Sequence, residues 1–481
     1  MRSTSRSTFV IRRIRFRVDY VSEIPDQSRS AASESDEGGS PSTGEVSRLA
    51  DHLFRHEAGR LVSVLIGIFG IDRLQLAEDV VQESLVRALK TWPYYGIPEN
   101  PAAWLTQTAK NLALDLIRRE KLFQDKQPQI ITFIEQWSAD SSADASASFD
   151  HEIKDDRLRL MFACCHPLIP QESQAALALK TLCGFSPAEI ARAFLSSEAA
   201  IAKRLTRARQ KIRELRIPFE IPSGADMPAR LDGVLQTLYL LFNEGYKASS
   251  GESLVREELC REAIRLTTLL AEHPVGNQPR VHALAALILL NGARLHGRTD
   301  TEGNILRLKE QDRSSWNQSM TGRGMFHMSQ SAAGDELSGY HLEAGIAACH
   351  CAAADYESTN WPQILSLYDH LVKIDDSPVV ALNRAVAIAQ VHGPRAGMAA
   401  VEAIPNRQSL EYYYLLYAVL AEFEAQLSNF ESAANHLRKA IRLTGLKSEQ
   451  YLLSNRLRDC ENPAANIPRL IPLNKNLVTE R

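Results

Sequence analysis

The spacing of apolar residues predicts helices along most of the chain. Apolar positions recur at helical intervals from about Val46 to Glu120, with one break at the Pro- and Gly-containing segment WPYYGIPENP, residues 92–101. A second helical segment runs from Asp155 to Arg216 and stops before the prolines of IPFEIP. No strand-like alternation of useful length occurs. The pattern therefore predicts an all-α fold.

Two polar segments flank the first helical block. Residues 1–45 are rich in Ser and Arg, then in Ser, Gly, Asp and Glu, and we interpret them as a disordered tail. Their six Arg in the first seventeen positions would suit nucleic-acid binding or an organelle transit peptide, but a solvated extension is the favoured interpretation. Residues 121–154 are polar, lack sustained periodicity and are typical of a flexible linker.

After residue 216 the sequence consists largely of Ala- and Leu-rich helical stretches separated by Pro, Gly or Asn turns. Small Ala side chains let paired helices approach closely, and the segment REAIRLT at 261 recurs as RKAIRLT at 438. Both features favour a stack of helical hairpins, an α-helical repeat domain over residues 217–481. The final part fits the tetratricopeptide (TPR) pattern best, at Leu420, Ala421, Leu427, Phe430, Ala433, Ala434 and Ala440.

The charges of the whole chain are nearly balanced. The 481 residues include 55 Lys and Arg against 58 Asp and Glu, so attraction to nucleic acid requires a local basic patch. No stretch approaches the ~20 apolar residues of a membrane span, and the N-terminus lacks the apolar region of a secretory signal. We therefore expect a cytoplasmic protein that makes no membrane contact.

The residues that usually carry catalysis or bind metals form no convincing group. Seven cysteines, none in a C-x-x-C pair, lie mostly within apolar helical patterns, which suits reduced, buried thiols. Cys and His are adjacent at residues 164–166 and 349–351, but adjacent residues point in different directions on a helix. No P-loop, H-E-x-x-H or G-x-S-x-G motif occurs. We expect no zinc site, no cofactor and no enzymatic activity.

A basic strip, GFSPAEIARAFLSSEAAIAKRLTRARQKIRELR at residues 184–216, supplies the local patch, because seven Lys or Arg occupy its last fourteen positions. Residues 186–189 combine a Ser cap, a Pro at N1 and a Glu that completes a capping box, so one helix begins there and ends near Leu195. The serines at 196–197 offer a break and a new cap, and a second helix extends to about Arg216. Two short helices across a tight turn form a helix-turn-helix.

The second of these helices has one apolar stripe and two basic flanks. The stripe, which can pack on the first helix, consists of Ile201, Leu205, Ala208 and Ile212. The flanks consist of Lys203, Arg204, Arg207 and Lys211 on one side and Arg209, Arg213 and Arg216 on the other. A nearly pure cationic surface repels itself unless phosphates contact it, so DNA is the expected partner. The alternative is a solvated charged helix on an all-helical enzyme or scaffold.

In a helix-turn-helix the first turns of the second helix reach base edges, and basic residues beside them hold the DNA backbone. We accordingly assign base reading to Ser197, Glu198, Ala200, Lys203 and Arg204. We assign phosphate contact to Arg207 and Lys211.

Two further segments, AEDVVQESLVRALKTWP at 77–93 and PAAWLTQTAKNLALDLIRRE at 101–120, carry a family resemblance. Together they resemble the second conserved region of bacterial RNA polymerase sigma factors of the extracytoplasmic-function type, and the helix-turn-helix at 155–216 resembles their fourth region. The resemblance implies a region 2-like domain at 46–120, a linker at 121–154 and a region 4-like domain at 155–216. Region 2 would serve core polymerase and the −10 element, and region 4 would serve the −35 element. Two elements about two DNA turns apart lie ~70 Å from each other, and a 34-residue linker reaches at most ~110 Å.

The resemblance also implies roles for individual residues. The first helix would dock on the clamp helices of the largest polymerase subunit, and region 4 would lie near the flap region. The implied polymerase contacts are Asp79, Gln82, Glu83 and Arg87. The implied −10 contacts are the base-capture loop residues Tyr94, Tyr95 and Asn100 and the helix residues Trp104, Lys110, Asn111, Arg118 and Arg119. A flipped base needs a polar pocket and a stacking wall, which the loop can supply; the alternative for the tyrosines is loop packing. Apolar Leu105, Leu112, Leu116 and Ile117 are expected in the core, and Asp115 could pair with either neighbouring Arg.

The part after residue 217 resembles one subgroup of these sigma factors, through blocks such as YLLFNEGYKASSGESLVREELCREAIRL, LKEQDRSSWN and SPVVALNRAVAIAQVHGP. In that subgroup a C-terminal helical-repeat domain is thought to take over regulation, so we expect an intramolecular contact between the repeats and the sigma domains. Internal hydrogen-bond networks are favoured over a ligand groove for the polar and aromatic residues Asn243, Glu244, Tyr246, Gln311, Asp312, Arg313, Trp316, Asn383 and Arg384.

The sequence thus predicts a promoter-specificity subunit of RNA polymerase that binds core polymerase and promoter DNA, with a C-terminal helical domain that modulates its activity. One alternative is a helix-turn-helix transcriptional regulator with a repeat sensor domain that acts without the polymerase. Such a regulator would have no use for the AEDVVQES helix. Another alternative is a helical-repeat scaffold with an incidental basic helix.

Overall fold

The computed structural model describes residues 57–66, 69, 73–119, 155–194, 196–215, 226–247, 255–300, 302 and 304–462. Within these ranges the regular elements are helices, apart from one isolated antiparallel bridge between Thr299 and Ile305. The expected all-α fold is confirmed. The predicted tail at 1–45 and linker at 121–154 lie outside the described residues. None of the helices in the described ranges has the length and apolar character needed to cross a membrane.

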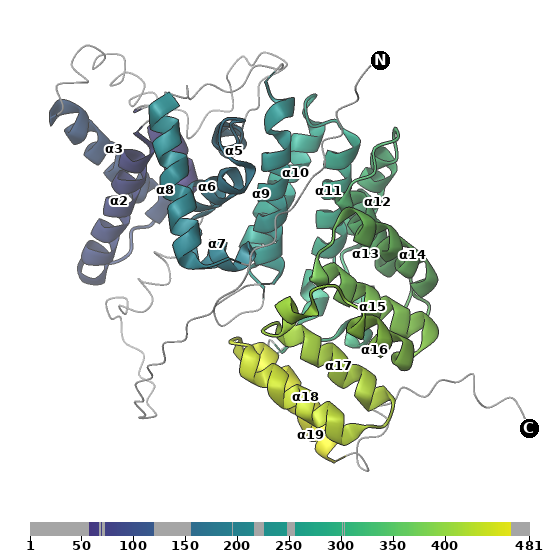
Figure 1. Ribbon diagram of the computed structural model, residues 1–481. Coiled ribbons are helices and arrows are strands. Elements are labelled where there is room, and N and C mark those ends of the chain that lie inside the picture. The colour runs from purple at the N-terminus through teal and green to yellow at the C-terminus, as the bar shows by residue number, and fades with distance from the viewer. Residues whose placement is uncertain are drawn as a thin grey trace, which may run out of the picture.

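The first block contains the helical residues 57–66 and two longer helices, α2 (Leu74–Tyr95) and α3 (Pro101–Arg119), which pack against each other (Figure 1). The rings of Trp92 and Trp104 meet edge to face with centroids 5.5 Å apart. Pro93 does not stop α2, although the sequence pattern predicts a break from residue 92. The helix continues to Gly96, whose φ of 84° is available to glycine without strain. Pro93 removes one backbone hydrogen bond, and the helix continues for two more residues without it.

The second block consists of four helices, α5 (Asp156–Cys164), α6 (Gln171–Cys183), α7 (Pro187–Ala193) and α8 (Glu198–Leu215). Asp155 begins α5, because its carboxylate accepts a hydrogen bond from the Leu158 N–H at 3.0 Å. Gly184 ends α6 in the left-handed conformation, with φ 67°. The short turn between α7 and α8 confirms the predicted helix-turn-helix.

The remaining helices form a series in which each helix packs against the next. They are α9 (Pro228–Tyr246), α10 (Glu257–Glu272), α11 (Pro279–Gly292), α12 (Gln318–Ser331), α13 (Gly339–Ala352), α14 (Trp361–Ile374), α15 (Pro378–His392), α16 (Pro394–Glu402), α17 (Tyr414–Gln426), α18 (Phe430–Leu443) and α19 (Lys447–Glu461). The similar segments REAIRLT and RKAIRLT lie in α10 and α18. The end of α9 also meets the end of the series, because Lys247 Nζ lies 3.0 Å from the Tyr414 hydroxyl and 3.2 Å from Glu449 Oε1.

The apolar core is continuous across the three parts of the chain. One cluster of buried side chains extends from Ala58 through both early blocks to Ala347 in α13, and a second cluster fills the interior of α15 to α19. At the junction of the second block with α9, a Cβ added to Gly233 would lie 2.9 Å from Cys165 Sγ. Figure 1 shows α9 and α10 beside α5, α6 and α7. The helix-turn-helix is therefore seated directly on the C-terminal helices.

Candidate nucleic-acid interface

The helix-turn-helix is built by two local caps. Ser186 Oγ accepts from the Glu189 N–H at 3.2 Å, and Glu189 Oε2 accepts from the Ser186 N–H at 2.8 Å, which completes the predicted capping box of α7. Ser197 Oγ accepts from the Ala200 N–H at 3.2 Å at the start of α8. These bonds satisfy N–H groups that a helix leaves free at its beginning, and they fix where α8 starts.

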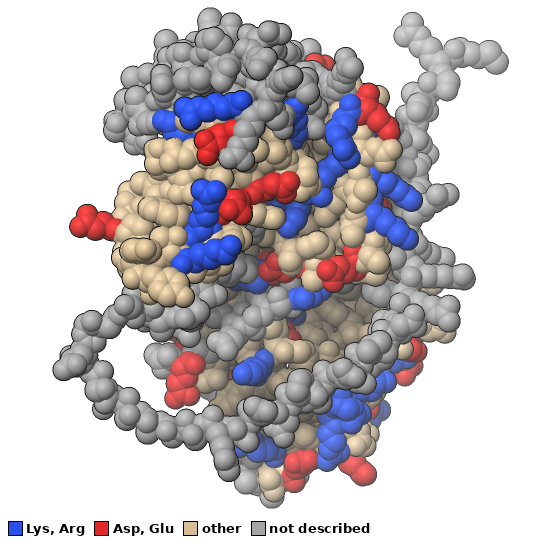
Figure 2. All heavy atoms as spheres, turned by 90° about the vertical axis from the view of Figure 1, so that its left-hand side faces the viewer, with Lys and Arg blue, Asp and Glu red and all other residues tan. Residues whose placement is uncertain are grey.

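The predicted stripe of α8 is buried, and the basic residues beside it differ in their contacts. Ile201, Leu205, Ala208 and Ile212 are each at most 3% exposed. Lys203 and Arg207 are exposed and Lys211 is half-buried, and none of the three forms an ion pair with another residue that the structure describes. Basic side chains run down the right of the face shown in Figure 2, over α8. These three side chains can contact phosphates without breaking an ion pair to another described residue.

Two arginines of α8 are already engaged by acidic residues elsewhere in the chain. Arg204 Nη2 lies 2.9 Å from Glu172 Oε2 at the start of α6. Arg209 Nη2 donates to Glu78 Oε2 of α2 at 2.7 Å. Arg204 therefore stays a candidate for base reading, with its guanidinium held by Glu172.

The other base-reading candidates, Ser197, Glu198 and Ala200, lie in the first turn of α8 and at its cap. Ser197 and Glu198 are exposed, and Ala200 is half-buried. Their placement matches the prediction, and their contact with bases stays a prediction.

The end of α2 presents two aromatic side chains to solvent. Tyr94 and Tyr95 are the last two residues of the helix and not part of the loop in which the sequence pattern places them, because α2 continues past Pro93. Tyr94 is 81% exposed and Tyr95 is 87% exposed, so neither packs against the loop. Asn100 has a structural duty, because its Oδ1 accepts from the Ala103 N–H at 3.0 Å and begins α3. The Asn-Pro pair at 100–101, a cap followed by a proline at N1, is the sequence signal for this role.

The candidate residues on α3 form an uneven surface. Trp104 is half-buried against Trp92, so one side of its indole is covered. Asn111 is exposed and accepts from Gln107 Nε2 at 3.0 Å. Arg118 is exposed and lies 3.8 Å from Asp115, one of the pairings considered from the sequence. Lys110 is half-buried, and the side chain of Arg119 lies outside the described residues.

The solvent face of α2 brings the candidate polymerase contacts together. Asp79, Gln82, Glu83 and Arg87 are all exposed. Arg87 Nε donates to Glu83 Oε1 at 3.2 Å, and Val86 and Leu89 add exposed apolar area between the polar groups. An exposed helix face with apolar and charged positions is suited to binding another protein.

Arg256, the residue before α10, binds the helix-turn-helix. Its Nη1 lies 2.7 Å from Glu189 Oε1 and 3.3 Å from Glu244 Oε1 of α9. Burial alone would raise the pKa of Glu189, but hydrogen bonds from the Ser186 N–H and from Arg256 lower it to about 2. The carboxylate that caps α7 is thus also tied to the C-terminal helices, which the sequence pattern could not show.

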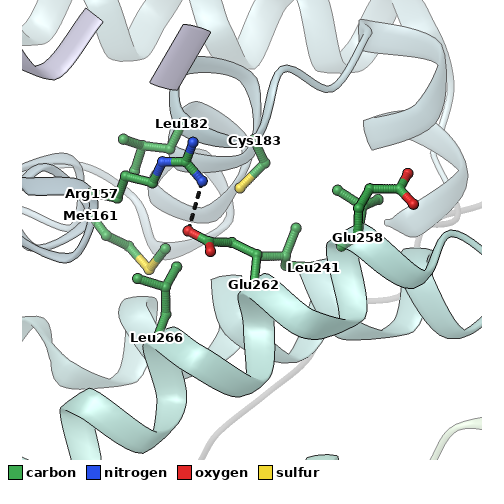
Figure 3. A pocket seen from close by; sticks show the side chains of 9 residues that line it. Arg157, Met161, Leu182, Cys183, Leu241, Glu258, Glu262 and Leu266 are labelled. Carbon is green, nitrogen blue, oxygen red and sulfur yellow. Dashed lines mark hydrogen bonds and ion pairs between the residues drawn. The ribbon is translucent and has the colours of Figure 1, made fainter. Parts of the chain in front are cut away.

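Two further ion pairs connect α5 with α10. Arg157 Nη1 lies 2.7 Å from Glu262 Oε1, and Arg265 Nη1 lies 2.6 Å from Asp155 Oδ2. Beside them is a small recess that is open to solvent and that Cys183 of α6 helps to line (Figure 3). Burial raises the pKa of the Cys183 thiol to about 12, so the thiol is neutral and unreactive.

The polar residues of the C-terminal domain serve internal networks, as expected, where their contacts are resolved. Arg313 donates to the carbonyls of His350 and Ala353 at 2.7 and 3.1 Å, which satisfies the end of α13. Arg384 Nε donates to Asp369 Oδ1 at 2.7 Å. The seven cysteines are free thiols, and five of them are buried.

Comparison with known proteins gives three family matches along the chain. Residues 53–123 match sigma-70 region 2, residues 159–212 match sigma-70 region 4, and residues 230–332 match a family of unknown function, DUF6596. An uncharacterized protein of Rhizobium meliloti (strain 1021) is 39% identical over 344 residues, which is 71% of this chain and 80% of the relative. No solved structure matches the chain.

Proposed function

Because the chain belongs to the sigma-70 family, with the region 2 and region 4 domains of an extracytoplasmic-function-like factor, we propose that it directs core RNA polymerase to specific promoters. The two regions imply binding of core polymerase and of promoter DNA. The observation that carries the proposal is the occurrence of both regions in family order, each with an accessible surface of suitable chemistry. The chemical step would be left to the polymerase.

Each step of initiation has a surface that supports it. The exposed face of α2 around Glu83 would dock on the clamp helices, and region 4 would lie near the flap. Tyr94 and Tyr95 stand free in solvent, where an extruded base of the −10 element could stack on them. Lys203, Arg207 and Lys211, which form no ion pair among the described residues, would hold the phosphates of the −35 element while the first turn of α8 reads bases.

We infer that the C-terminal helical domain modulates this activity by holding region 4. Support comes from the shared apolar core and from three charged contacts, Arg256 with Glu189, Arg157 with Glu262 and Arg265 with Asp155. These contacts reach α5 and α7 but leave Lys203 and Arg207 on α8 exposed. The domain would therefore set the position of region 4 without covering its DNA-binding flank.

The decisive experiment is run-off transcription with purified core polymerase and the full chain on the DNA upstream of its own gene. We expect discrete transcripts, and Tyr95→Ala is expected to reduce them about 10- to 100-fold, since stacking on one base contributes ~1–3 kcal/mol. Tyr412→Ala is the matched control, because Tyr412 is also exposed, at 68%, but lies before α17. Sequence-specific DNA binding without core binding or transcripts would contradict the proposal and favour a free-standing regulator.

A further inference from the structure

We propose that Glu78 anchors a latch that closes region 2 onto region 4 in the unbound chain and that opens before both promoter elements are engaged. The consequence for transcription rests on the proposed function, whereas the latch itself is a contact between two parts of the chain. The contact joins α2 to α6 and α8.

Both oxygens of the Glu78 carboxylate are bound by region 4. Oε2 accepts from Arg209 Nη2 at 2.7 Å, and Oε1 accepts from the Thr181 hydroxyl at 3.1 Å. The residue is 7% exposed and occupies the face of α2 opposite the exposed Asp79 and Glu83. A buried carboxylate requires such partners, because an unpaired charge away from water is strongly destabilising. The site of Glu78 is therefore formed by region 4 and not by region 2 alone.

The seam around Glu78 contains one close backbone contact and one recess. A Cβ added to Gly59 would lie 2.1 Å from the Leu182 carbonyl oxygen, so the first helical segment touches the backbone of α6. Ala58, Val62 and Val81 line, together with Lys180 and Thr181, a small recess that is open to solvent. The seam thus combines apolar contacts that belong to the continuous core with one charged network. Glu78, Arg209 and Thr181 can each be hydrated when the seam separates, which lowers the cost of opening.

The closed arrangement is too short for simultaneous contact with both promoter elements. Along ideal helices, Tyr95 lies about 26 Å from Glu78, and Ala200 lies about 14 Å from Arg209. Even if α2 and α8 extended in opposite directions from the ion pair, the two DNA-reading ends would remain well short of the ~70 Å between elements two turns apart. Occupation of both elements therefore requires Glu78 and Arg209 to part.

The exposed face of α2 remains available in the closed form. Gln82, a candidate polymerase contact, also lines the recess beside Glu78. Core polymerase can consequently bind the closed chain and reach the edge of the latch, so we assign polymerase docking as the event that favours opening.

The test compares amide hydrogen exchange in the full chain and in three variants, Glu78→Gln, Arg209→Gln and the double variant, without polymerase or DNA. We expect exchange in the facing parts of α2 and α6 to rise about tenfold, equivalent to ~1.4 kcal/mol of opening free energy. Exchange in the double variant should be little faster than in either single variant, because the two substitutions remove the same interaction. Glu57→Gln is the matched control, since Glu57 pairs at 3.9 Å with Arg60 on its own helix.

Adding core polymerase to the wild-type chain should raise exchange in the facing part of α6, whereas α2 itself would be covered by the polymerase. Wild-type exchange rates in both single variants would overturn the latch, and so would independent, additive effects of the two substitutions. If Glu78→Gln fails to fold, Arg209→Gln still tests the same bond from a side chain that is 21% exposed. A seam that loosens as expected in a chain that supports no transcription would refute the proposed function and leave the latch standing.

Discussion

Glu189 belongs at once to the cap of α7 and to an ion pair with Arg256. Its folded pKa of about 2 lies below its ordinary value of 4.5, so the ionised carboxylate contributes to stability above about pH 4.5. That contribution is lost as the pH falls from about 4.5 toward 2. Glu189→Gln should lower the free energy of unfolding at neutral pH by about 1.5–3 kcal/mol, the range for hydrogen bonds to charged groups.

Thermal unfolding as a function of pH checks this prediction. The difference between wild type and Glu189→Gln should be largest at neutral pH and should shrink below about pH 4.5. Glu431→Gln, at an exposed position in the first turn of α18, provides the comparison. A difference that stayed constant down to pH 2 would show that the ionised form of Glu189 is not the stabilising species.

Local chemistry at single residues could be anticipated, and long-range partners could not. The capping box of Ser186 and Glu189 follows from spacing alone, and the structure confirms it. The partners of Arg204 and Arg209 come from α6 and α2, and Glu78 lies 131 residues from Arg209 in the sequence. No periodicity links such positions, so the sequence cannot show that two of the four arginines described in these flanks, Arg204 and Arg209, are paired.

Among the elements, α8 offers the sharpest test of DNA binding. Arg207 is exposed and makes no ion pair within the described parts of the chain. Replacing it with Gln should weaken binding to all DNA sequences by a similar factor and should reduce the slope of log affinity against log salt by about 1.

Titration of holoenzyme binding to promoter DNA at several salt concentrations measures this slope. Arg261→Gln is the control, because Arg261 is 71% exposed on α10 and pairs with Glu257 on the same helix. An unchanged slope in Arg207→Gln would show that residues other than Arg207 contact the DNA phosphates.

Element boundaries show where pattern reasoning succeeds and where it fails. The apolar stripe of α8 is buried as predicted, because four apolar residues at helical spacing lie on the same face of the helix. The predicted end of α2 is too early, because Pro93 removes one backbone hydrogen bond without ending the helix, which continues to Tyr95 before Gly96 ends it. Leu105 is buried as expected, but Leu112 and Leu116 are only half-buried, since α3 has a partner along part of its length.

At the scale of the whole molecule, the sigma regions depend on the C-terminal helices for burial. Met161, Phe162 and Cys165 are fully buried, and Arg230 of α9 donates to the Phe162 carbonyl at 3.2 Å. A chain ending at residue 220 would expose this face of α5 and α6 to water. Since each large apolar side chain contributes about 1.5–3 kcal/mol on burial, the shortened chain should unfold at a markedly lower temperature and self-associate.

Thermal unfolding and size-exclusion chromatography of residues 1–220 and of the full chain check this dependence. Equal melting temperatures with a monomeric short chain would show that region 4 is complete without α9. The result also decides how a loss of transcription by the short chain is interpreted, because an unstable region 4 cannot bind DNA for reasons unrelated to regulation.

The continuous core was not predictable, because each block shows its own helical periodicity and the apolar positions do not indicate which block they face. The sequence pattern is equally compatible with independent domains joined by linkers and with domains that share one core. The order of the blocks and their helical character were predictable from the chain, whereas their mutual packing depends on surface shape, as at Gly233 against Cys165.

The close approach of Gly233 to Cys165 has a consequence for how such proteins can diversify. Recombination at residue 216 that brought in a foreign helix-turn-helix would place an unmatched surface against α9. The chimera would then be poorly packed at the contact between these two parts. Point changes on the outer side of α8 carry no such penalty. New promoter preferences in this lineage should therefore arise by drift of a few exposed side chains, while the helix-turn-helix and the C-terminal helices are inherited as one unit.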